Sequence, residues 1–438
     1  MMRSIVLLFP ALCCTCRADL ASSFEDILLD AINPVEDDEV SREIAKELKM
    51  GAPEMIAHYG YKVENHTAKT EDGFLLGLQR IPESTKGAKA SEKYPVLLQH
   101  GVLCCSGNFI DNGNDSLGFF LADKGYDVWL GNLRANRYSK KHMTLKEEDD
   151  AFWDFSIDEH VTYDLPAMID YIRSTTKKDK ILLVAHSMGT TISFSMLASQ
   201  PEMNKKIKGF LALAPVGSVK YITSSAIYAA KYSAVIKSAA EFANVKQFAT
   251  HSPFVENFLR HFCPGSPGVC TGFVNLYSGY DSHLINQTRY PIYLSDCTGG
   301  TSVKVMNHLG QLITNGGLNK FDYGLTKNKE VYGQDFPPEY DVGKVTAPVI
   351  LVHAANDALS DPLDVAILNA KLKTVIEKYL FPDYTGTHSA FFWLTNATER
   401  FFNKLLELLK KIEKNEIKKI IYILIKFLGK CNNYNGYI

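Results

Sequence analysis

The sequence lacks the features that mark nucleic-acid-binding, metal-dependent and nucleotide-dependent proteins. Its charge is nearly balanced, with 47 basic and 49 acidic residues among 438, so no strongly basic face favours a nucleic-acid partner. It has no HExxH sequence, no paired CxxC, no GxxxxGK[ST] and no GxGxxG after a predicted strand. Glu159 and His160 resemble metal ligands only in isolation, and we interpret them as a solvated or hydrogen-bonded surface pair. We therefore predict no metal, no cofactor, no nucleic-acid partner and no obligate protein partner.

Apolar runs long enough to cross a bilayer are also missing, so no transmembrane segment is predicted. Arg3 precedes an apolar stretch, and small residues precede a cleavage position after Ala18. This pattern is typical of a secretory signal peptide over residues 1–18. At the other end, residues 406–438 form a basic amphipathic tail. It either lies on a membrane surface or packs loosely on the domain, which we favour; its role stays open.

Cysteine is too scarce for a disulfide scaffold. Three of the nine cysteines lie in the predicted signal peptide, and an oxidising compartment permits one or two bridges among the rest. Cys263 and Cys270 flank a short, turn-rich loop and are our best candidate pair. Buried free thiols are as good an interpretation of the remaining cysteines. Candidate N-glycosylation sequons stand at Asn65, Asn114, Asn286 and Asn396. Chance alone gives roughly three such sequons in a chain of this composition, so their number is weak evidence for glycosylation.

From residue 94 onward, strongly apolar runs alternate with helical patterns. Strands are predicted over 95–101, 126–132, 181–187, 209–215, 348–356 and 377–383. Helices are predicted over 118–126, over 163–176, after Ser187 and from about Ser389. Strands this uniformly apolar are covered on both faces, which predicts an α/β fold with a mostly parallel sheet and helices on each side.

The alternation stops for about 130 residues after Pro215, far longer than the connections usual in α/β units. We therefore predict an inserted helical cap subdomain over 216–347. The predicted core then consists of residues 19–215, which include a lead-in segment over 19–60, and residues 348–405. Each aromatic residue of the insertion taken singly is best explained by core packing. As a whole, the insertion leaves the carboxyl end of a parallel strand, where open sheets bind ligands.

Three residues suited to nucleophilic catalysis follow separate predicted strands. A serine hydroxyl needs a histidine to accept its proton, and the histidine needs an acid to orient it. In α/β hydrolases the chain order is serine, acid, histidine. Ser187 follows the strand 181–187, Asp357 follows 348–356, and His388 is the only histidine beyond Asp357. We predict that these three form a catalytic triad, although the first glycine expected around such a serine is replaced by Ala185.

The negative charge that develops on the substrate oxygen requires preorganised N–H donors. One is predicted to be the backbone N–H of Met188, which follows the nucleophile at the start of a helix. The other is assigned to the backbone N–H of Val102, in the loop after the strand 95–101. His100 is interpreted as a residue that orients this loop.

Several motifs together resemble the acid lipase family of gastric and lysosomal lipases and their invertebrate relatives. They are HGVLCCSGNF (100–109), GNLRANRYSKKH (131–142), FWDFSIDEHVTYDLPAMIDYI (152–172), AHSMGTT (185–191), YLSDCTGGTSVKVMNHLGQ (293–311), NDALSDPLDV (356–365) and HSAFFW (388–393). The resemblance extends over roughly residues 50–410, in the same order throughout.

The resemblance implies an α/β-hydrolase fold with a cap and lid, secreted or lysosomal, that hydrolyses triacylglycerols or cholesteryl esters without a metal, often at acidic pH. It implies the same roles for Ser187, Asp357 and His388, and for the N–H groups of Val102 and Met188. It also implies that Cys263 and Cys270 correspond to the family's cap disulfide. The implied partner is a neutral lipid at an oil–water or membrane interface.

Three positions depart from the family pattern near the predicted triad. Ala185 replaces a glycine, Met188 replaces a glutamine, and Ala390 stands where a carboxylate is usual. We expect the first two changes to alter packing and the pocket wall, and the third to remove a charge near the histidine loop. The main hypothesis is an active lipase that forms an acyl-enzyme. Alternatives are a weakened, lipid-binding or storage protein of the same fold, and an esterase for smaller soluble esters.

Overall fold

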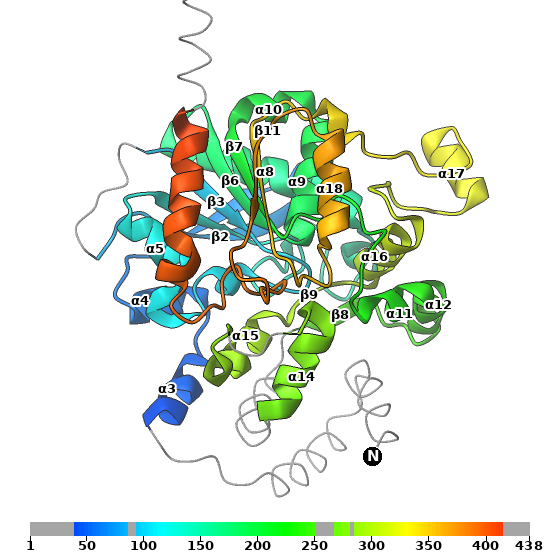
Figure 1. The fold of residues 1–438 in the computed structure, drawn as a ribbon. Coiled ribbons are helices and arrows are strands. Elements are labelled where there is room, and N and C mark those ends of the chain that lie inside the picture. The colour runs from blue at the N-terminus through cyan, green and yellow to red at the C-terminus, as the bar shows by residue number, and fades with distance from the viewer. Residues whose placement is uncertain (1–38, 86–92, 251–266, 281–283, 415–438) are drawn as a thin grey trace, which may run out of the picture.

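The computed structural model describes residues 39–85, 93–250, 267–280 and 284–414, and its centre is a nine-stranded sheet (Figure 1). Six strands are parallel and lie in the spatial order β4, β3, β6, β7, β10, β11. Their bounds are β3 Pro95–Gln99, β4 Asp127–Gly131, β6 Ile181–His186, β7 Ile207–Leu213, β10 Val349–His353 and β11 Val375–Leu380. Each falls in or overlaps a predicted strand, so the expected mostly parallel sheet is confirmed.

Three further strands extend the sheet at one edge and were not predicted from the sequence. β2 (Phe74–Ile81) pairs antiparallel with β4, and β1 (Glu64–Lys69) pairs antiparallel with β2. The short β5 (Lys141–His142) also pairs with β2. β1 is largely exposed, so it lacks the apolar run that identifies the central strands.

Helices cover both faces of the sheet and form two apolar clusters with it. One cluster includes α5 (Leu117–Asp123) and the helix over residues 403–414. The other includes α8 (Leu165–Thr176), α9 (Met188–Ser199) and α18 (Pro362–Lys371). Neighbouring residues of a strand alternate between the clusters, since successive side chains point to opposite faces. Figure 1 shows α5 and the C-terminal helix on one side, and α8, α9 and α18 on the other.

The end of the chain differs from the prediction in one respect. No helix begins at Ser389; residues around it form turns, and helical structure starts with a π-helix over Thr398–Phe402. Backbone N–H groups in this stretch bond to distant carbonyls, as in His388 N–H to Ser278 O and Thr395 N–H to Leu284 O. Between these two residues, the N–H groups of Ala390, Phe392 and Trp393 bond to carbonyls three or four residues back, which closes turns but does not continue into a helix.

The helix over 403–414 extends past residue 406, where the predicted tail begins. Its leucines at 405, 408 and 409 are buried against the sheet, together with Ile412. Residues 415–438 lie outside the described residues, so the role of the tail stays open. Within the described ranges, none of the helices is both long and apolar enough to traverse a bilayer.

The segment predicted to be a cap is mainly helical. It contains α11 (Ala226–Lys231), α12 (Ser233–Phe242), α14 (Pro267–Ser278), α15 (Tyr290–Asp296), α16 (Val303–Asn315) and α17 (Leu325–Tyr332). It also contains an unpredicted two-stranded sheet, in which β8 (Gln247–Thr250) pairs with β9 (Gly299–Ser302). Figure 1 shows α11, α12, α14 and α15 together beyond one end of the large sheet.

Hydrogen bonds fix the position of this helical segment relative to the sheet. The carbonyl of Ser278, at the end of α14, accepts from the N–H groups of Ala358 and His388. The carbonyl of Ala358 accepts from Thr223 and Ser224. Because Ala358 and His388 follow β10 and β11, the segment lies beside the carboxyl ends of the parallel strands, where ligands bind in open α/β sheets.

Candidate active site

Ser187 occupies a strained turn between β6 and α9. Its backbone has φ 54° and ψ −126°, a conformation that residues with side chains rarely adopt. The strand before it is completely buried, and the helix after it begins at Met188. A sharp strand-to-helix turn of this kind presents a serine hydroxyl at the end of a sheet. The predicted nucleophile is thus on a turn of the expected geometry.

The two residues flanking this turn have different steric requirements. A β-carbon on Gly189 would lie 2.7 Å from the carbonyl oxygen of His100 and 2.8 Å from that of Gln99. Alanine at that position would therefore force backbone atoms apart. Ala185, in contrast, is buried within the cluster formed with α8 and α9, and its methyl group is part of that packing. Position 189, two residues after the serine, therefore requires glycine, whereas position 185, two residues before it, accommodates alanine.

His388 and Asp357 contact each other in the loops after β11 and β10. The ring Nδ1 of His388 lies 2.9 Å from both carboxylate oxygens of Asp357, and both side chains are buried. Backbone N–H groups of Leu359 and Ser360 also donate to Asp357, at 2.9 and 2.7 Å. Because a carboxylate only accepts, Nδ1 carries a proton, and the lone pair of the neutral ring is then on Nε2. That Nε2 is buried and has no hydrogen-bond partner among the described residues.

His186 connects the serine turn to the histidine loop, a role that the sequence did not indicate. Its Nε2–H donates to the backbone carbonyl of His388 at 2.9 Å, and the two rings are 4.6 Å apart. Burial and then the proximity of His388 lower the pKa of His186 well below its usual value. His186 therefore stays neutral, which suits a donor that holds the loop of His388 beside Ser187. Its position directly before Ser187 is the only feature of the sequence that could have indicated this role.

The loop predicted to supply an oxyanion donor lies against Ser187. A β-carbon on Gly101 would stand 3.0 Å from Ser187 Cβ and 3.4 Å from its Oγ. His100 holds this loop: its Nδ1–H donates to the carbonyl of Gly101 at 2.7 Å, and its Nε2 accepts from the N–H of Leu133 at 3.2 Å. Burial lowers the pKa of His100 to about 4, so the ring is neutral and can accept that bond. These contacts agree with the orienting role expected for His100.

Parts of this chain match models of known protein families, and most of its length matches known proteins. A family model described as a partial alpha/beta-hydrolase lipase region matches residues 52–113, and one described as an alpha/beta hydrolase fold matches residues 94–261. Gastric triacylglycerol lipase of Rattus norvegicus is 37% identical over 368 residues, which cover 83% of this chain and 92% of that protein. Lysosomal acid lipase/cholesteryl ester hydrolase of Homo sapiens is 36% identical over 373 residues, covering 84% and 92%. The chain belongs to the acid lipase family. Lipase lipl-1 of Caenorhabditis elegans is similarly related, at 37% identity over 375 residues, covering 83% and 92%.

The α/β-hydrolase fold expected from the resemblance is thereby confirmed, and the protein is a lipase of that superfamily. Its enzymatic class is that of the serine ester hydrolases.

The interpretation of Glu159 and His160 in this acid lipase as a surface pair was wrong. His160 is buried, and its Nδ1 lies 2.7 Å from Asp164, not from Glu159. Asp164 also pairs with Arg134, whose Nη2 lies 2.7 Å from it. Glu159 accepts from the backbone N–H of Ser156 at the start of a short helix. The charges of Asp164 and Arg134 compensate each other, which is why this polar cluster can be buried.

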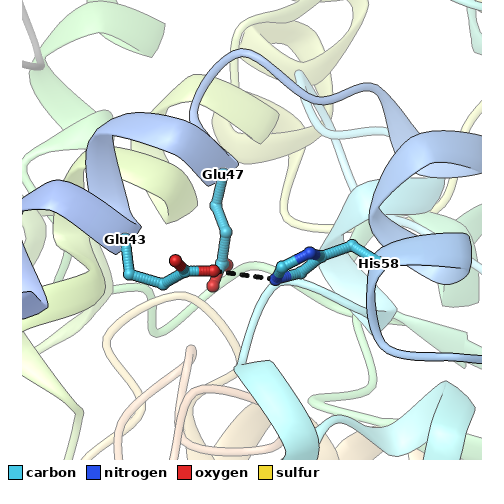
Figure 2. Close-up of side chains that lie close together, drawn as sticks. All are labelled: Glu43, Glu47 and His58. Atoms are coloured by element: carbon cyan, nitrogen blue, oxygen red, sulfur yellow. Dashed lines mark ion pairs between the residues drawn. The ribbon is translucent and has the colours of Figure 1, made fainter.

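One other cluster of potential metal ligands lies within the described ranges. Figure 2 shows Glu43 and Glu47 of α3 (Glu39–Glu47) together with His58 of α4 (Ala52–His58). Glu43 pairs with His58 at 2.8 Å, whereas Glu47 pairs with Arg289 and accepts from the hydroxyl of Tyr59 at 2.7 Å. A guanidinium thus already neutralises Glu47, so we interpret the cluster as ion pairs that fasten α3 to neighbouring elements.

The remaining candidate residues are placed as follows. Asn65, Asn114 and Asn396 are exposed and Asn286 is half-buried, so the four sequons stay candidate glycosylation sites. Cys270 is buried in α14, but Cys263 and the predicted signal peptide over 1–18 lie outside the described residues. The Cys263–Cys270 disulfide therefore stays a prediction.

Proposed function

We propose that this acid lipase hydrolyses the carboxylic ester bonds of neutral lipids, triacylglycerols or cholesteryl esters, through Ser187, His388 and Asp357. The observation that carries the proposal is the His388–Asp357 pair at 2.9 Å, whose second ring nitrogen is buried and has no hydrogen-bond partner among the described residues, Ser187 included. The His388 ring lies 4.6 Å from that of His186, which directly precedes the strained turn of Ser187. An unprotonated nitrogen in that environment is suited to take the proton of a serine hydroxyl.

The proposed reaction proceeds in two halves. His388 Nε2 removes the Ser187 proton as the serine oxygen attacks the ester carbonyl, and the resulting imidazolium is stabilised by Asp357. The N–H groups of Val102 and Met188 stabilise the oxyanion, and each such donor contributes roughly 3–4 kcal/mol in related chemistry. The imidazolium then protonates the leaving alcohol. Water, activated by the same histidine, hydrolyses the acyl-enzyme.

An exposed apolar surface supports a lipid substrate. We call it the α11–α12 surface; its members are Ile227, Tyr228, Tyr232, Val235, Ile236 and Phe242. Tyr228 is 70% exposed, Val235 67% and Phe242 96%, so large apolar side chains face solvent there. A set of exposed apolar residues this concentrated is typical of contact with another apolar phase.

Backbone bonds connect this surface to the active-site side of the molecule. The N–H of Ser225 donates to the carbonyl of Leu276 at 3.3 Å, which fastens the start of α11 to the end of α14. Ser278, two residues beyond Leu276, holds the backbone of His388. The α11–α12 surface is therefore suited to bring an oil–water or membrane interface near the site.

The departures at Ala185, Met188 and Ala390 do not oppose this proposal. Met188 would act through its backbone N–H, and the Ala185 methyl is accommodated in the core. Ala390 is completely buried among apolar side chains. The histidine loop is held instead by bonds of His388 to Ser278 and His186. The gastric and lysosomal relatives also support a secretory-pathway or lysosomal location.

The test is a comparison of the expressed chain with Ser187→Ala and a matched control, Ser199→Ala, at the far end of α9. Emulsified triolein, cholesteryl oleate and soluble p-nitrophenyl esters are assayed across acidic and neutral pH, together with labelling by a fluorophosphonate. We expect Ser187→Ala to abolish turnover and labelling, and Ser199→Ala to retain both. Wild type that neither reacts with the probe nor cleaves any ester would refute the proposal and support a lipid-binding protein.

The substrate class is tested separately with Val235→Ser on the α11–α12 surface. We expect a lower rate on emulsified triolein and an unchanged rate on a soluble ester. Val331→Ser, at an exposed valine of α17 outside that surface, is the control. If Val235→Ser and Val331→Ser hydrolysed the emulsion at the same rate, and the wild type preferred soluble esters, the protein would instead be an esterase for small substrates.

A further inference from the structure

Two thiols, Cys104 and Cys297, come together where the loop after β3 meets the end of α15. Both are free cysteines, and each thiol lies close enough to the other to shift its pKa. The thiol of Cys297 also lies 4.0 Å from the side-chain oxygen of Asn108. Cys104 lies two residues after Val102, and Cys297 directly follows α15. The pair therefore connects two parts of the chain. One is the loop that we expect to supply an oxyanion donor, and the other is the inserted helical segment.

Backbone contacts hold the two cysteine-bearing segments tightly together. The N–H of Gly299 donates to the carbonyl of Leu103 at 2.7 Å. A β-carbon on Gly299 would lie 2.7 Å from the carbonyl oxygen of Cys104. Arg137, which follows β4, also holds Gly299 in place, because its N–H donates to the carbonyl of Gly299 at 2.8 Å. A disulfide needs backbones that approach closely before it forms, and these contacts bring the two segments together within two residues of each cysteine.

A third cysteine, Cys105, adjoins this pair but has a different partner. Its thiol is buried and lies 3.6 Å from the carboxylate of Asp296. The Asp296 carboxylate in turn packs against the backbone of Gly107. The thiol of Cys105 therefore already has a partner in Asp296, and Cys105 provides a matched control for Cys104.

The environment of the pair disfavours thiolates. The Cys297 thiol lowers the pKa of Cys104, but burial and the nearby Asp111 and Asp296 outweigh it, so that pKa is raised overall. The Cys104 thiol and burial raise the pKa of Cys297 well above its usual value. Because the thiolate is the reactive form, oxidation should be slow at acidic or neutral pH and faster in mildly alkaline solution.

We propose that Cys104 and Cys297 form a disulfide that fastens the loop after β3 to the inserted segment. The oxidant is a low-molecular-weight disulfide such as oxidised glutathione. One cysteine thiolate, after losing its proton to solvent, attacks that disulfide and releases one small thiol. The second cysteine then attacks the mixed disulfide and releases the other small thiol, so two protein thiols are oxidised and one small disulfide is reduced. The bridge holds the Val102 loop and α15 in their present contact.

The test is peptide mapping of the full chain after incubation with defined ratios of oxidised to reduced glutathione at mildly alkaline pH. Remaining thiols are blocked with N-ethylmaleimide, and the protein is digested without reduction. We expect a cross-linked peptide that contains Cys104 and Cys297 and is lighter by two hydrogen atoms than its parts. Cys297→Ser should lose it, and Cys105→Ser should retain it. Maleimide on both Cys104 and Cys297 under the most oxidising ratio, or a bridge from Cys297 to Cys105, would overturn the proposal.

A second measurement tests the tether in the wild-type protein without any substitution. We expect the thermal midpoint of the oxidised protein to exceed that of the reduced protein by several degrees. The same comparison in Cys297→Ser corrects for the predicted Cys263–Cys270 bridge and should show a smaller difference. If oxidation raised the thermal midpoint equally in the wild type and in Cys297→Ser, the proposed Cys104–Cys297 bridge would be contradicted. The bridge does not depend on the proposed function, so a bridged but catalytically inert protein would refute that function and not the bridge.

Discussion

Replacing Gly189 with alanine tests whether close packing between α9 and the end of β3 positions the turn of Ser187, the proposed nucleophile. The added β-carbon would lie 2.7 Å from the carbonyl oxygen of His100 and 2.8 Å from that of Gln99, whereas ordinary contact begins near 3.4 Å. Both obstacles are backbone atoms, so no side chain can rotate away. The loop from Gln99 to Val102, or the turn of Ser187, must therefore move by about 0.6–0.7 Å, which is the difference between 3.4 Å and these two distances.

The expected magnitudes follow from that displacement. Overpacking a close contact costs about 1–3 kcal/mol of stability, and the better helix propensity of alanine returns about 0.5–1 kcal/mol. A misplacement approaching 1 Å at a reacting group can lower the rate by about 100-fold. We therefore expect kcat/KM to fall by about 10- to 100-fold, with a smaller effect on the free energy of unfolding.

The assay uses a soluble p-nitrophenyl ester, so that binding to a lipid interface does not contribute, and urea unfolding of the same samples. The control is Gly272→Ala in α14, where a β-carbon would meet nothing within 4 Å. That variant should keep wild-type kcat/KM and gain about 0.5–1 kcal/mol of stability. Wild-type kcat/KM in Gly189→Ala would refute the argument that this contact positions the site.

Three further predictions concern residues around the site. Asp357→Asn removes the carboxylate that holds the His388 proton on Nδ1, and kcat should fall by about 10⁴-fold with the fold intact by circular dichroism; a fall of less than tenfold would count against the triad. Ala185→Gly should cost about 1 kcal/mol in urea unfolding because glycine weakens a strand, and should leave kcat/KM unchanged; a large gain in rate would mean that the methyl group constrains the turn. His100 has its pKa lowered by burial to about 4, against about 6.5 when unfolded, so the unfolded chain binds more protons between these values. Stability should thus fall by about 3 kcal/mol as pH falls through that window, and urea midpoints of His100→Gln should depend less steeply on pH; an equally steep dependence would contradict this origin.

Much of the fold could be predicted because the central strands are buried on both faces. Such strands are uniformly apolar, and that property is visible in a short window of sequence. β1 has one exposed face and β8 and β9 are only four residues each, so they lack that signal. The helix expected at Ser389 is interrupted because the N–H groups of His388 and Thr395 bond to residues more than 100 positions away, and the local bonds between them close only turns.

The chemistry of the candidate site was accessible for a similar reason. Ser187, Asp357 and His388 each follow a recognisable strand, and parallel strands bring their carboxyl ends to one edge of the sheet. The supporting residues were not accessible, because a histidine such as His160 carries no sequence mark of whether its partner is a neighbour or Asp164.

The sequence by itself therefore determined the order of the central strands along the chain and membership of the acid lipase family, and it predicted the three side chains of the proposed triad. These depend on local patterns and on the order of residues. Only the tertiary structure decided that Gly189 and not Ala185 is sterically required, that His186 holds the loop of His388, and that Cys104 lies near Cys297 while the thiol of Cys105 faces Asp296. Each of those depends on how β3, α9 and α15 pack against one another, and a contact between distant segments is a property of the packed chain.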